Sequence, residues 1–394
     1  MIYLDNNATT RPCEKAVEAA REMVESCWHN PSSAHRMGQE ARRRVELARR
    51  SVAALIGAKG REIVFTSGGT ESVNLAIRGV LSRMPASRRT VVTTPIEHEA
   101  VRDLLSALAR DPSDPVCVRE LPVDRRGFVR PEDLAESIDG SVALVTIQWA
   151  NNETGVIQPL DELASIARGK GVLFHTDATQ AVGKLDVDLD GALDGVDMLT
   201  LSAHKFHGAK GAGALFVREN VRLRPTFHGT QELARRGGTE GTAMVAAMGA
   251  AADVAREWLA DPSGRARVEA LRDRLETALL DACDGALLIS PAENAHRLWN
   301  TTNIAFPGVR SELLVMSLSE SGVCASSGSA CASGATESSP VIEAMGLAVG
   351  GTEELAYSSV RFSLSRETTV DEIERAIGVI VPVVRSISQT RDAI

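Results

Sequence analysis

The sequence predicts an α/β fold built around a mostly parallel β-sheet. Between about residues 35 and 217, short apolar runs typical of strands alternate with amphipathic patterns typical of helices. This order places parallel strands between two layers of helices. The chain has 394 residues, 44% of them hydrophobic and 24% charged, which is enough for two domains. We expect a large domain at residues 11–255 and a smaller α/β domain formed by residues 1–10 and 256–394.

The predicted elements of the large domain follow from apolar runs and from residues that begin or end helices. A long amphipathic helix is expected from about residue 34 to Gly57, because glycine commonly ends a helix. A strand at residues 62–66 leads into a helix from Thr70, and a strand at residues 90–94 leads into a helix near His98. Further strands are expected at residues 116–119, 142–147, 172–175, 196–201 and 213–217.

The last third of the chain predicts a second group of elements. From about Met244, two helical patterns run through Trp258 and across residues 265–280. Strands at residues 301–306 and 358–363 and a final helix from Val370 complete the predicted smaller domain. Residues 321–339 are rich in Ser, Ala and Gly, a composition typical of a flexible loop.

Composition and charge argue against several classes of function. The net charge of −9 makes a nucleic-acid surface unexpected. No apolar run reaches ~18 residues, so we expect no membrane-spanning helix, and the N-terminus lacks the pattern of a secretory signal. Six cysteines without a CxxC pair indicate free thiols in a reducing compartment, the cytoplasm, rather than disulfides or a metal site.

One lysine stands out as a candidate for covalent chemistry. The chain has six lysines against 37 arginines, and a lysine forms an imine with an aldehyde where an arginine does not. Lys205 lies in residues 202–211 (SAHKFHGAKG), between a strand-like run and a glycine-rich turn. From this segment alone, a Schiff-base lysine and an ordinary surface lysine are equally good interpretations.

Two further segments add the remaining parts of a cofactor site. Residues 67–70 (SGGT) follow a strand and open a helix, so the backbone N–H groups around Gly69 and Thr70 could bind an anion. Asp177 follows another strand and could pair with a protonated ring nitrogen, although an N-cap is the more ordinary role. Together with Lys205, these groups match the requirements of pyridoxal phosphate.

With these segments in order, the chain resembles the cysteine desulfurases of the NifS/IscS-type group. These are class V, fold-type I, pyridoxal-phosphate-dependent enzymes. The resemblance implies the fold of those transferases, with a large mostly parallel-sheet domain and a smaller α/β C-terminal domain. The carriers of the resemblance run nearly end to end: YLDNNATT at residues 3–10, NPSS at 30–33, FTSGGTES at 65–72, EH at 97–98, NNETG at 151–155, the segments of Asp177 and Lys205, SSGSAC at 326–331 and SSVRFS at 358–363.

The resemblance implies roles around the cofactor. Lys205 is the Schiff-base lysine, His98 stacks on the ring and helps proton transfer, and Asp177 pairs with the ring nitrogen. The remaining implied contacts are with the ring oxygen, by Gln180 and Asn152, and with the phosphate, by Gly69, Thr70, Ser202 and His204. Thr239 would reach the phosphate of a neighbouring subunit, which implies a homodimer with shared sites.

The resemblance also implies the reaction. Asn152 faces the substrate, Arg361 binds the carboxylate of L-cysteine, and Cys331 accepts its sulfur as a persulfide, leaving L-alanine. The sulfur then passes to an acceptor protein, either an iron–sulfur scaffold or a thiolation enzyme. We interpret Cys324 as a strand-end residue, with a second redox thiol as the alternative.

Two segments, residues 229–241 and 332–340, differ from the sequence pattern that is usual in the family. The first surrounds Thr239, and the second follows Cys331. Two other functions stay open. A class V aminotransferase or lyase would not need Cys331, and a non-catalytic scaffold homologue would not need Lys205.

Overall fold

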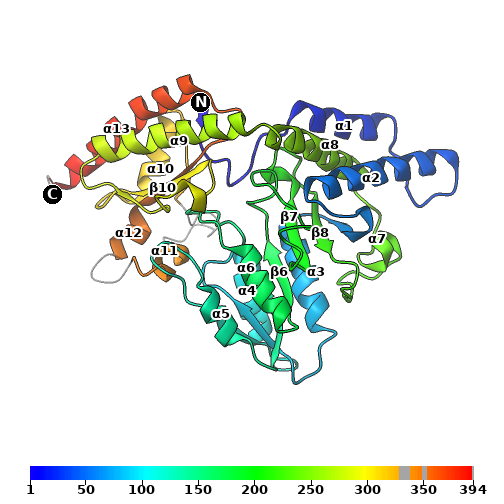
Figure 1. Cartoon of the computed structure of the whole chain (residues 1–394). Coiled ribbons are helices and arrows are strands. Elements are labelled where there is room, and N and C mark those ends of the chain that lie inside the picture. The colour runs from blue at the N-terminus through cyan, green and yellow to red at the C-terminus, as the bar shows by residue number, and fades with distance from the viewer. Residues whose placement is uncertain (328–337, 348–352, 393–394) are drawn as a thin grey trace.

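The computed structural model describes residues 1–327, 338–347 and 353–392, and it confirms the predicted α/β fold (Figure 1). A seven-stranded sheet has the order β2-β8-β7-β6-β5-β3-β4. Neighbours are parallel from β4 to β7, whereas β8 runs antiparallel to both β7 and β2. The strands are β2 (Ile63–Thr66), β3 (Thr90–Thr93), β4 (Cys117–Glu120), β5 (Val142–Thr146), β6 (Leu173–Asp177), β7 (Met198–Ser202) and β8 (Gly213–Val217).

Helices cover both faces of this sheet because successive strand residues are buried on opposite sides. Val91 and Leu144 pack against α3 and α4, whereas Val92 and Val145 belong to the core that includes residues of α2, α6 and α8. This alternation follows the two-residue period of a strand. The helices of this part are α1 (Glu14–Glu25), α2 (Arg36–Leu55), α3 (Gly69–Leu81), α4 (Glu99–Ala109), α5 (Pro131–Ser137), α6 (Leu160–Gly169), α7 (Gln231–Ala234) and α8 (Thr242–Leu259), with 3₁₀ turns η1 (Gly60–Glu62) and η2 (Ala203–Lys205).

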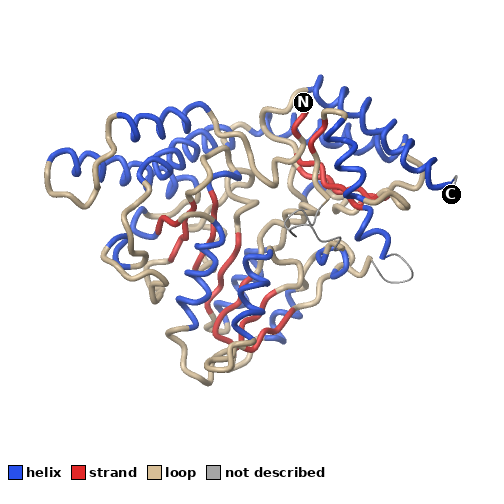
Figure 2. Tube along the Cα trace, turned by 180° about the vertical axis from the view of Figure 1, so that it is seen from behind, coloured by secondary structure: helices blue, strands red, loops and turns tan. Residues whose placement is uncertain are grey.

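The C-terminal third forms a second core around two smaller sheets. One sheet is antiparallel with the order β12-β10-β9, and the other pairs β1 with β11 in parallel. Figure 2 shows the N-terminus beside these C-terminal elements. Their bounds are β1 (Ile2–Tyr3), β9 (Leu287–Leu288), β10 (Thr301–Ala305), β11 (Val323–Cys324), β12 (Ser359–Ser363), η3 (Asn294–His296), α9 (Pro262–Ala282), α10 (Ser311–Glu320), α11 (Pro340–Ala344), α12 (Glu353–Ser358) and α13 (Val370–Asp392).

One predicted loop is partly wrong. Residues 321–339 were expected to be a loop throughout, yet Val323 and Cys324 form strand β11, because Val323 is buried and pairs with Ile2 of β1. Cys324 therefore does lie at a strand end, as interpreted from the sequence. Cys331 and most of the departing segment 332–340 lie outside the described residues.

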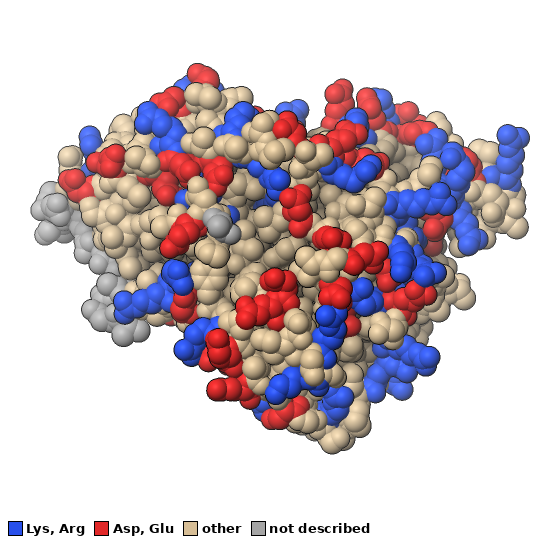
Figure 3. Space-filling view, in the orientation of Figure 1, with Lys and Arg blue, Asp and Glu red and all other residues tan. Residues whose placement is uncertain are grey.

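The surface carries both signs of charge. Figure 3 shows acidic and basic side chains interspersed over the visible face. In the part of the chain that the structure describes, no helix is long and apolar enough to cross a membrane.

Candidate active site

The predicted site lies where the parallel strands end. Asp177 is the last residue of β6 and Ser202 the last residue of β7, and these strands are adjacent and parallel. His98 follows β3 and caps α4. Because the carboxyl ends of parallel strands meet at one edge, the sheet brings the three side chains to the same side of the molecule.

Asp177 is buried and His98 is half-buried, and hydrogen bonds fix the orientation of both side chains. Nδ1 of His98 accepts a hydrogen bond of 3.1 Å from the backbone N–H of Ala100, so the other ring nitrogen carries the proton of the neutral form. Burial lowers the pKa of His98, although the charge of Asp177 raises it. Asp177 is 4% exposed, and its Oδ1 accepts a bond of 2.9 Å from the backbone N–H of Thr179.

Lys205 ends the 3₁₀ turn η2 that follows β7. Its amine donates hydrogen bonds to the backbone oxygens of Asn7, at 2.6 Å, and Ala8, at 2.9 Å. The N-terminal segment therefore supplies part of the site. This contribution could not be predicted locally, since Asn7 and Lys205 are 198 residues apart.

The start of α3 is where the sequence predicts an anion cup. A side chain is excluded at Gly213, because its Cβ would come 2.6 Å from the Cα of Gly68. A Cβ on Gly69 would lie 3.2 Å from Oγ1 of Thr179 and 3.8 Å from the Cβ of Ser202. Oγ1 of Thr179 is buried without a hydrogen-bond partner in the described part of the chain. An unpaired hydroxyl beside the N-terminus of a 13-residue helix fits a phosphate.

Thr179 was not among the predicted phosphate ligands, and Thr70 and His204 were. Thr70 lies in the first turn of α3 and is exposed. His204 lies beside Lys205, with Nδ1 3.2 Å from Oγ1 of Thr9. Burial and the charge of Lys205 lower the pKa of His204 to about 4, so its ring is neutral at neutral pH. The signal for Thr179 was its place in residues 177–180 (DATQ), two positions after Asp177.

Asn7 joins the two halves of the site through its hydrogen bonds. Its Nδ2 donates to Oγ1 of Thr301, at 2.9 Å, and to the backbone oxygen of Asn152, at 3.1 Å. Its backbone oxygen accepts a bond of 2.8 Å from Nε2 of Gln180, in addition to the bond from Lys205. Asn7 is 1% exposed, so these contacts are shielded from water.

Arg361 approaches the same region from β12. It is 3% exposed, and its Nη1 donates a bond of 2.9 Å to the backbone oxygen of Asn152. Its Nη2 lies 2.6 Å from Oδ1 of Asp5. Nε of Arg361 has no partner among the residues that the structure describes. The side chain of Asn152 is oriented by Gln148, whose Nε2 donates to Oδ1 of Asn152 at 3.2 Å.

Glu153 links this region to the end of the segment that follows Cys331. Oγ of Ser339 donates a bond of 2.6 Å to Oε2 of Glu153, and Ser339 caps α11. Burial raises the pKa of Glu153. Cys331 itself lies outside the described residues, so its distance from Lys205 is not part of this geometry.

The departing segment at residues 229–241 has an unusual backbone. Glu232, Leu233 and Ala234 have φ angles of 49°, 57° and 60°, a left-handed conformation that costs L-residues energy. Both oxygens of Glu232 bind the guanidinium of Arg49, at 2.7 and 2.8 Å, and one also accepts the N–H of Phe65 at 2.8 Å. This buried pair holds the strained turn against α2 and β2.

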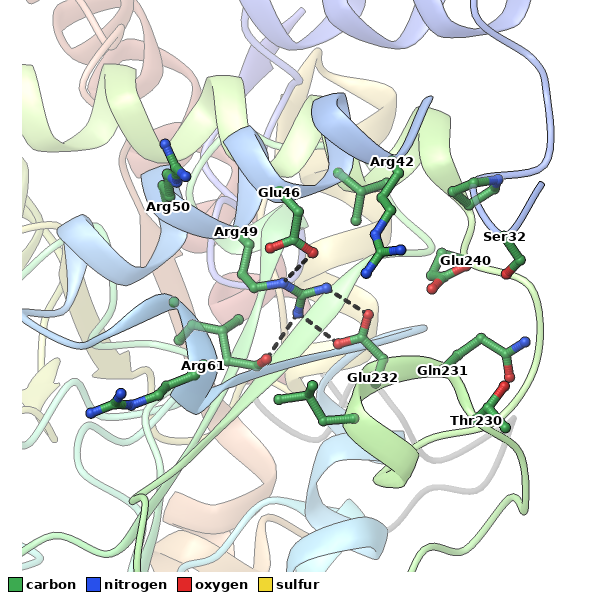
Figure 4. Close-up of a pocket in the computed structure, with 15 residues that line it drawn as sticks. Ser32, Arg42, Glu46, Arg49, Arg50, Arg61, Thr230, Gln231, Glu232 and Glu240 are labelled. Carbon is green, nitrogen blue, oxygen red and sulfur yellow. Dashed lines mark hydrogen bonds and ion pairs between the residues drawn. The ribbon is translucent and has the colours of Figure 1, made fainter. Parts of the chain in front are cut away.

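A cavity of about 540 Å³ lies beside this turn (Figure 4). Figure 4 shows Arg49 and Glu232 pointing toward each other, with Arg42 and Glu46 nearby. None of the predicted catalytic residues lines the cavity. Thr239 is exposed, whereas Arg236 of the same segment pairs with Glu71 in the first turn of α3, with Nε 2.8 Å from Oε1.

Comparison with known proteins assigns the sequence to one family. The sequence pattern described as class V aminotransferase covers residues 2–376. Cysteine desulfurase NifS of Azotobacter vinelandii is 42% identical over 385 residues, which cover 97% of this chain and 92% of that protein. A cysteine desulfurase of Cereibacter sphaeroides is 44% identical over 385 residues, which cover 97% of this chain and 95% of that protein.

Solved structures agree with the sequence comparison. A NifS-like protein superimposes with a TM-score of 0.88 at 35% identity, covering 98% of this chain and 99% of the other. SspA in complex with cysteine superimposes with a TM-score of 0.78 at 32% identity, covering 94% of this chain and 100% of the other. The chain belongs to the class V aminotransferases, a family of enzymes that depend on pyridoxal phosphate. Within that family it groups with the NifS-type cysteine desulfurases.

Proposed function

We propose that the protein is a cysteine desulfurase that removes sulfur from L-cysteine, leaves L-alanine and holds the sulfur as a persulfide on Cys331. The observation that carries the proposal is the convergence of Lys205, Asp177 and the start of α3 at one edge of the sheet, with Arg361 close by through Asn152. This set contains an amine, a carboxylate for a ring nitrogen, an anion cup and a carboxylate-binding guanidinium.

The proposed cofactor is pyridoxal 5'-phosphate. Its phosphate would be held by Gly69, Thr70, Ser202 and His204, and we add Thr179 to this group because its hydroxyl is buried and unpaired among the described residues. Asp177 would pair with the ring nitrogen, and Gln180 and Asn152 would lie near the ring oxygen. When bound, the cofactor supplies an electron sink for the substrate carbon.

Side chains of the protein carry out substrate binding, proton transfer and sulfur removal in this proposal. Arg361 binds the substrate carboxylate. The amine of Lys205 takes the proton from Cα, a task that requires a pKa well below the ~10.4 of a free lysine. His98, whose pKa is lowered by desolvation at its half-buried position, is the proposed partner in proton transfer. The thiolate of Cys331 attacks the substrate sulfur, so that an S–S bond forms as the C–S bond breaks.

The proposal also covers the oligomeric state, the domain division, the cellular compartment and the sulfur acceptor. A homodimer with shared sites would let exposed Thr239 reach the phosphate of a neighbouring subunit. We propose the domain division 11–255 and 1–10 with 256–394, the cytoplasm as the compartment, and an iron–sulfur scaffold or a thiolation enzyme as the sulfur acceptor. The thiols of Cys13 and Cys27, which are buried and free, are compatible with a reducing compartment.

Cys331→Ser tests the proposal against an aminotransferase or lyase. Purified wild-type protein is expected to absorb near ~420 nm, as bound cofactor does. Given L-cysteine without reductant, it should gain about 32 Da on the peptide that holds Cys331. Cys331→Ser should keep the absorbance and lose alanine and sulfide production by orders of magnitude, because a hydroxyl is a far weaker nucleophile toward sulfur.

The other outcomes separate the alternatives. No Lys or Arg lies between Arg310 and Arg361, so one tryptic peptide holds both Cys324 and Cys331. Fragmentation of this peptide that places the added mass on Cys324 would refute the assignment of Cys331. Full activity of Cys331→Ser without any added mass would favour the aminotransferase or lyase. Wild-type protein without cofactor absorbance, even after incubation with pyridoxal phosphate, would indicate a scaffold homologue.

A further inference from the structure

A second lysine is buried next to the proposed catalytic lysine. Lys184 is 4% exposed, and its amine donates hydrogen bonds to Oδ1 of Asn7, at 2.9 Å, and Oε1 of Gln180, at 2.5 Å. Both acceptors are neutral amide oxygens rather than carboxylates. A lysine in such a place is costly unless its amine is satisfied and uncharged, so its presence calls for a reason other than packing.

The surroundings of Lys184 favour the uncharged amine. Burial lowers its pKa well below the usual value, and the positive charges of Lys205 and Arg361 lower it further. Burial above all, with smaller effects of Arg366 and Lys184, lowers the pKa of His207 to about 4, so this ring adds no positive charge at neutral pH. A neutral amine has two N–H groups, and the two amide oxygens of Asn7 and Gln180 take both.

These hydrogen bonds determine the positions of Oε1 and Nε2 in the Gln180 amide. Because Lys184 holds Oε1, the Nε2 end of Gln180 faces the backbone oxygen of Asn7 at 2.8 Å. The same oxygen accepts the amine of Lys205 at 2.6 Å. One N–H group of Gln180 and the amine of Lys205 therefore meet at the backbone oxygen of Asn7. Lys184, which donates to Oε1, and this oxygen, which accepts from Nε2, both require the same orientation of the Gln180 amide.

Asn7 is less dependent on Lys184 than Gln180 is. Its Oδ1 also accepts a bond of 3.1 Å from Asn300, and its Nδ2 donates to Thr301 at 2.9 Å. Loss of the Lys184 amine would leave Asn7 oriented by these neighbours. Oε1 of Gln180, by contrast, would lose the donor that holds it, and a buried acceptor left unpaired favours rearrangement.

We propose that Lys184 is a positioning residue of the active site, which holds the amide of Gln180 so that the second N–H group of Nε2, the one not bonded to Asn7, is presented beside the amine of Lys205. The inference rests on the proposed function, because the N–H group is useful only if a cofactor oxygen lies there. An N–H donor at that oxygen favours its anionic form. Lys184 thereby lowers the pH at which the bound cofactor loses its proton.

The test is a spectrophotometric pH titration of the holoenzyme. Lys184→Met keeps most of the side-chain volume and removes the amine. We expect the pH midpoint of the visible absorbance change to rise by about one unit, a tenfold change in the proton equilibrium. Lys170→Met, which replaces an exposed lysine at the end of α6, is the matched control and should keep the wild-type midpoint.

A double variant shows whether Lys184 acts through Gln180. Gln180→Leu should raise the midpoint by itself, and Lys184→Met with Gln180→Leu should give the same midpoint as Gln180→Leu alone. If Lys184→Met does not fold, Lys184→Gln, which is shorter and uncharged, is titrated in its place with the same expected direction.

The results distinguish the inference from the proposed function. A variant with lower thermal stability but the wild-type midpoint would make Lys184 a structural residue and overturn the inference. Additive shifts in the double variant would also overturn it. A wild-type protein without cofactor absorbance would refute the proposed function, and the inference would fall with it.

Discussion

Arg361 and Asp5 form an ion pair in which Nη2 of the arginine lies 2.6 Å from Oδ1 of the aspartate. Arg361 is almost fully buried, and its Nη1 is bound to the backbone oxygen of Asn152. The guanidinium is therefore held in place before any substrate arrives. A substrate carboxylate would meet an arginine that has already lost its conformational freedom, which favours binding.

Arg361→Ala should raise the KM for L-cysteine about ten- to a hundredfold, because a charge-assisted contact contributes roughly 1.5–3 kcal/mol. Cofactor absorbance should be kept. Steady-state kinetics of alanine formation gives the KM. Arg375→Ala removes an exposed arginine paired with Asp371 and should leave the KM unchanged. A wild-type KM in Arg361→Ala would remove this arginine from the substrate site.

Lys205→Ala and Lys205→Arg should both abolish turnover. The arginine variant keeps the positive charge but has no amine that reacts with an aldehyde. Borohydride reduction of the wild-type holoenzyme followed by peptide mass spectrometry should find the cofactor on Lys205. Its appearance on Lys184 or Lys210 would refute the assignment.

Ala234→Gly should stabilise the protein by about 0.5–1 kcal/mol. Ala234 is exposed and has a φ of 60°, a conformation that glycine adopts without the Cβ clash of alanine. Urea unfolding measures the change. Ala19→Gly, within helix α1, should instead destabilise by a similar amount. A loss of stability in Ala234→Gly would mean that the left-handed turn is not the conformation in solution.

Glu97→Gln should weaken the pH dependence of stability. Burial raises the pKa of Glu97 to about 8, from a reference value of 4.5. The folded protein therefore holds a proton that the unfolded chain releases. The stabilising contribution is complete below about pH 4.5 and is lost as the pH rises toward 8.

Urea unfolding at several pH values measures this effect. Between pH 4.5 and 8, the free energy of unfolding should fall less steeply in Glu97→Gln than in wild type, by about 1 kcal/mol per pH unit. Glu25→Gln replaces an exposed glutamate of α1 and should keep the wild-type slope. Parallel curves for wild type and Glu97→Gln would show that Glu97 ionises normally.

Groups that follow a strand could be predicted from the sequence. Asp177, Ser202 and the glycines before Thr70 each come directly after an apolar run, and the structure places those runs as adjacent or nearby strands of one sheet. The period of the apolar residues and the glycines at turns are local signals. Because the carboxyl ends of parallel strands lie at one edge of a sheet, these local signals were enough to predict that the three groups lie near one another.

The contacts of Asn7 and the reversed direction of β8 had no local signal. Asn7 binds Ser363 and Thr301, which are 356 and 294 residues away. Lys184 was not recognised because a buried lysine has the same sequence pattern as an exposed one. The strain at Ala234 was equally hidden, since it depends on the ion pair between Arg49 and Glu232 across 183 residues.

The placement of Asn7 sets an order of events during synthesis. Its backbone N–H bonds to Oγ of Ser363, near the end of the chain. At ~5–20 residues per second, a ribosome needs about 20 to 80 s for 394 residues. For most of that time the N-terminal segment has no strand β11 or β12 to join, so the first residues translated are among the last to find their native contacts. A nascent chain cut short before Ser363 could fold its central sheet, but the hydroxyl that binds the backbone N–H of Asn7 would be missing, and with it one of the contacts that place the backbone oxygens of Asn7 and Ala8 against Lys205.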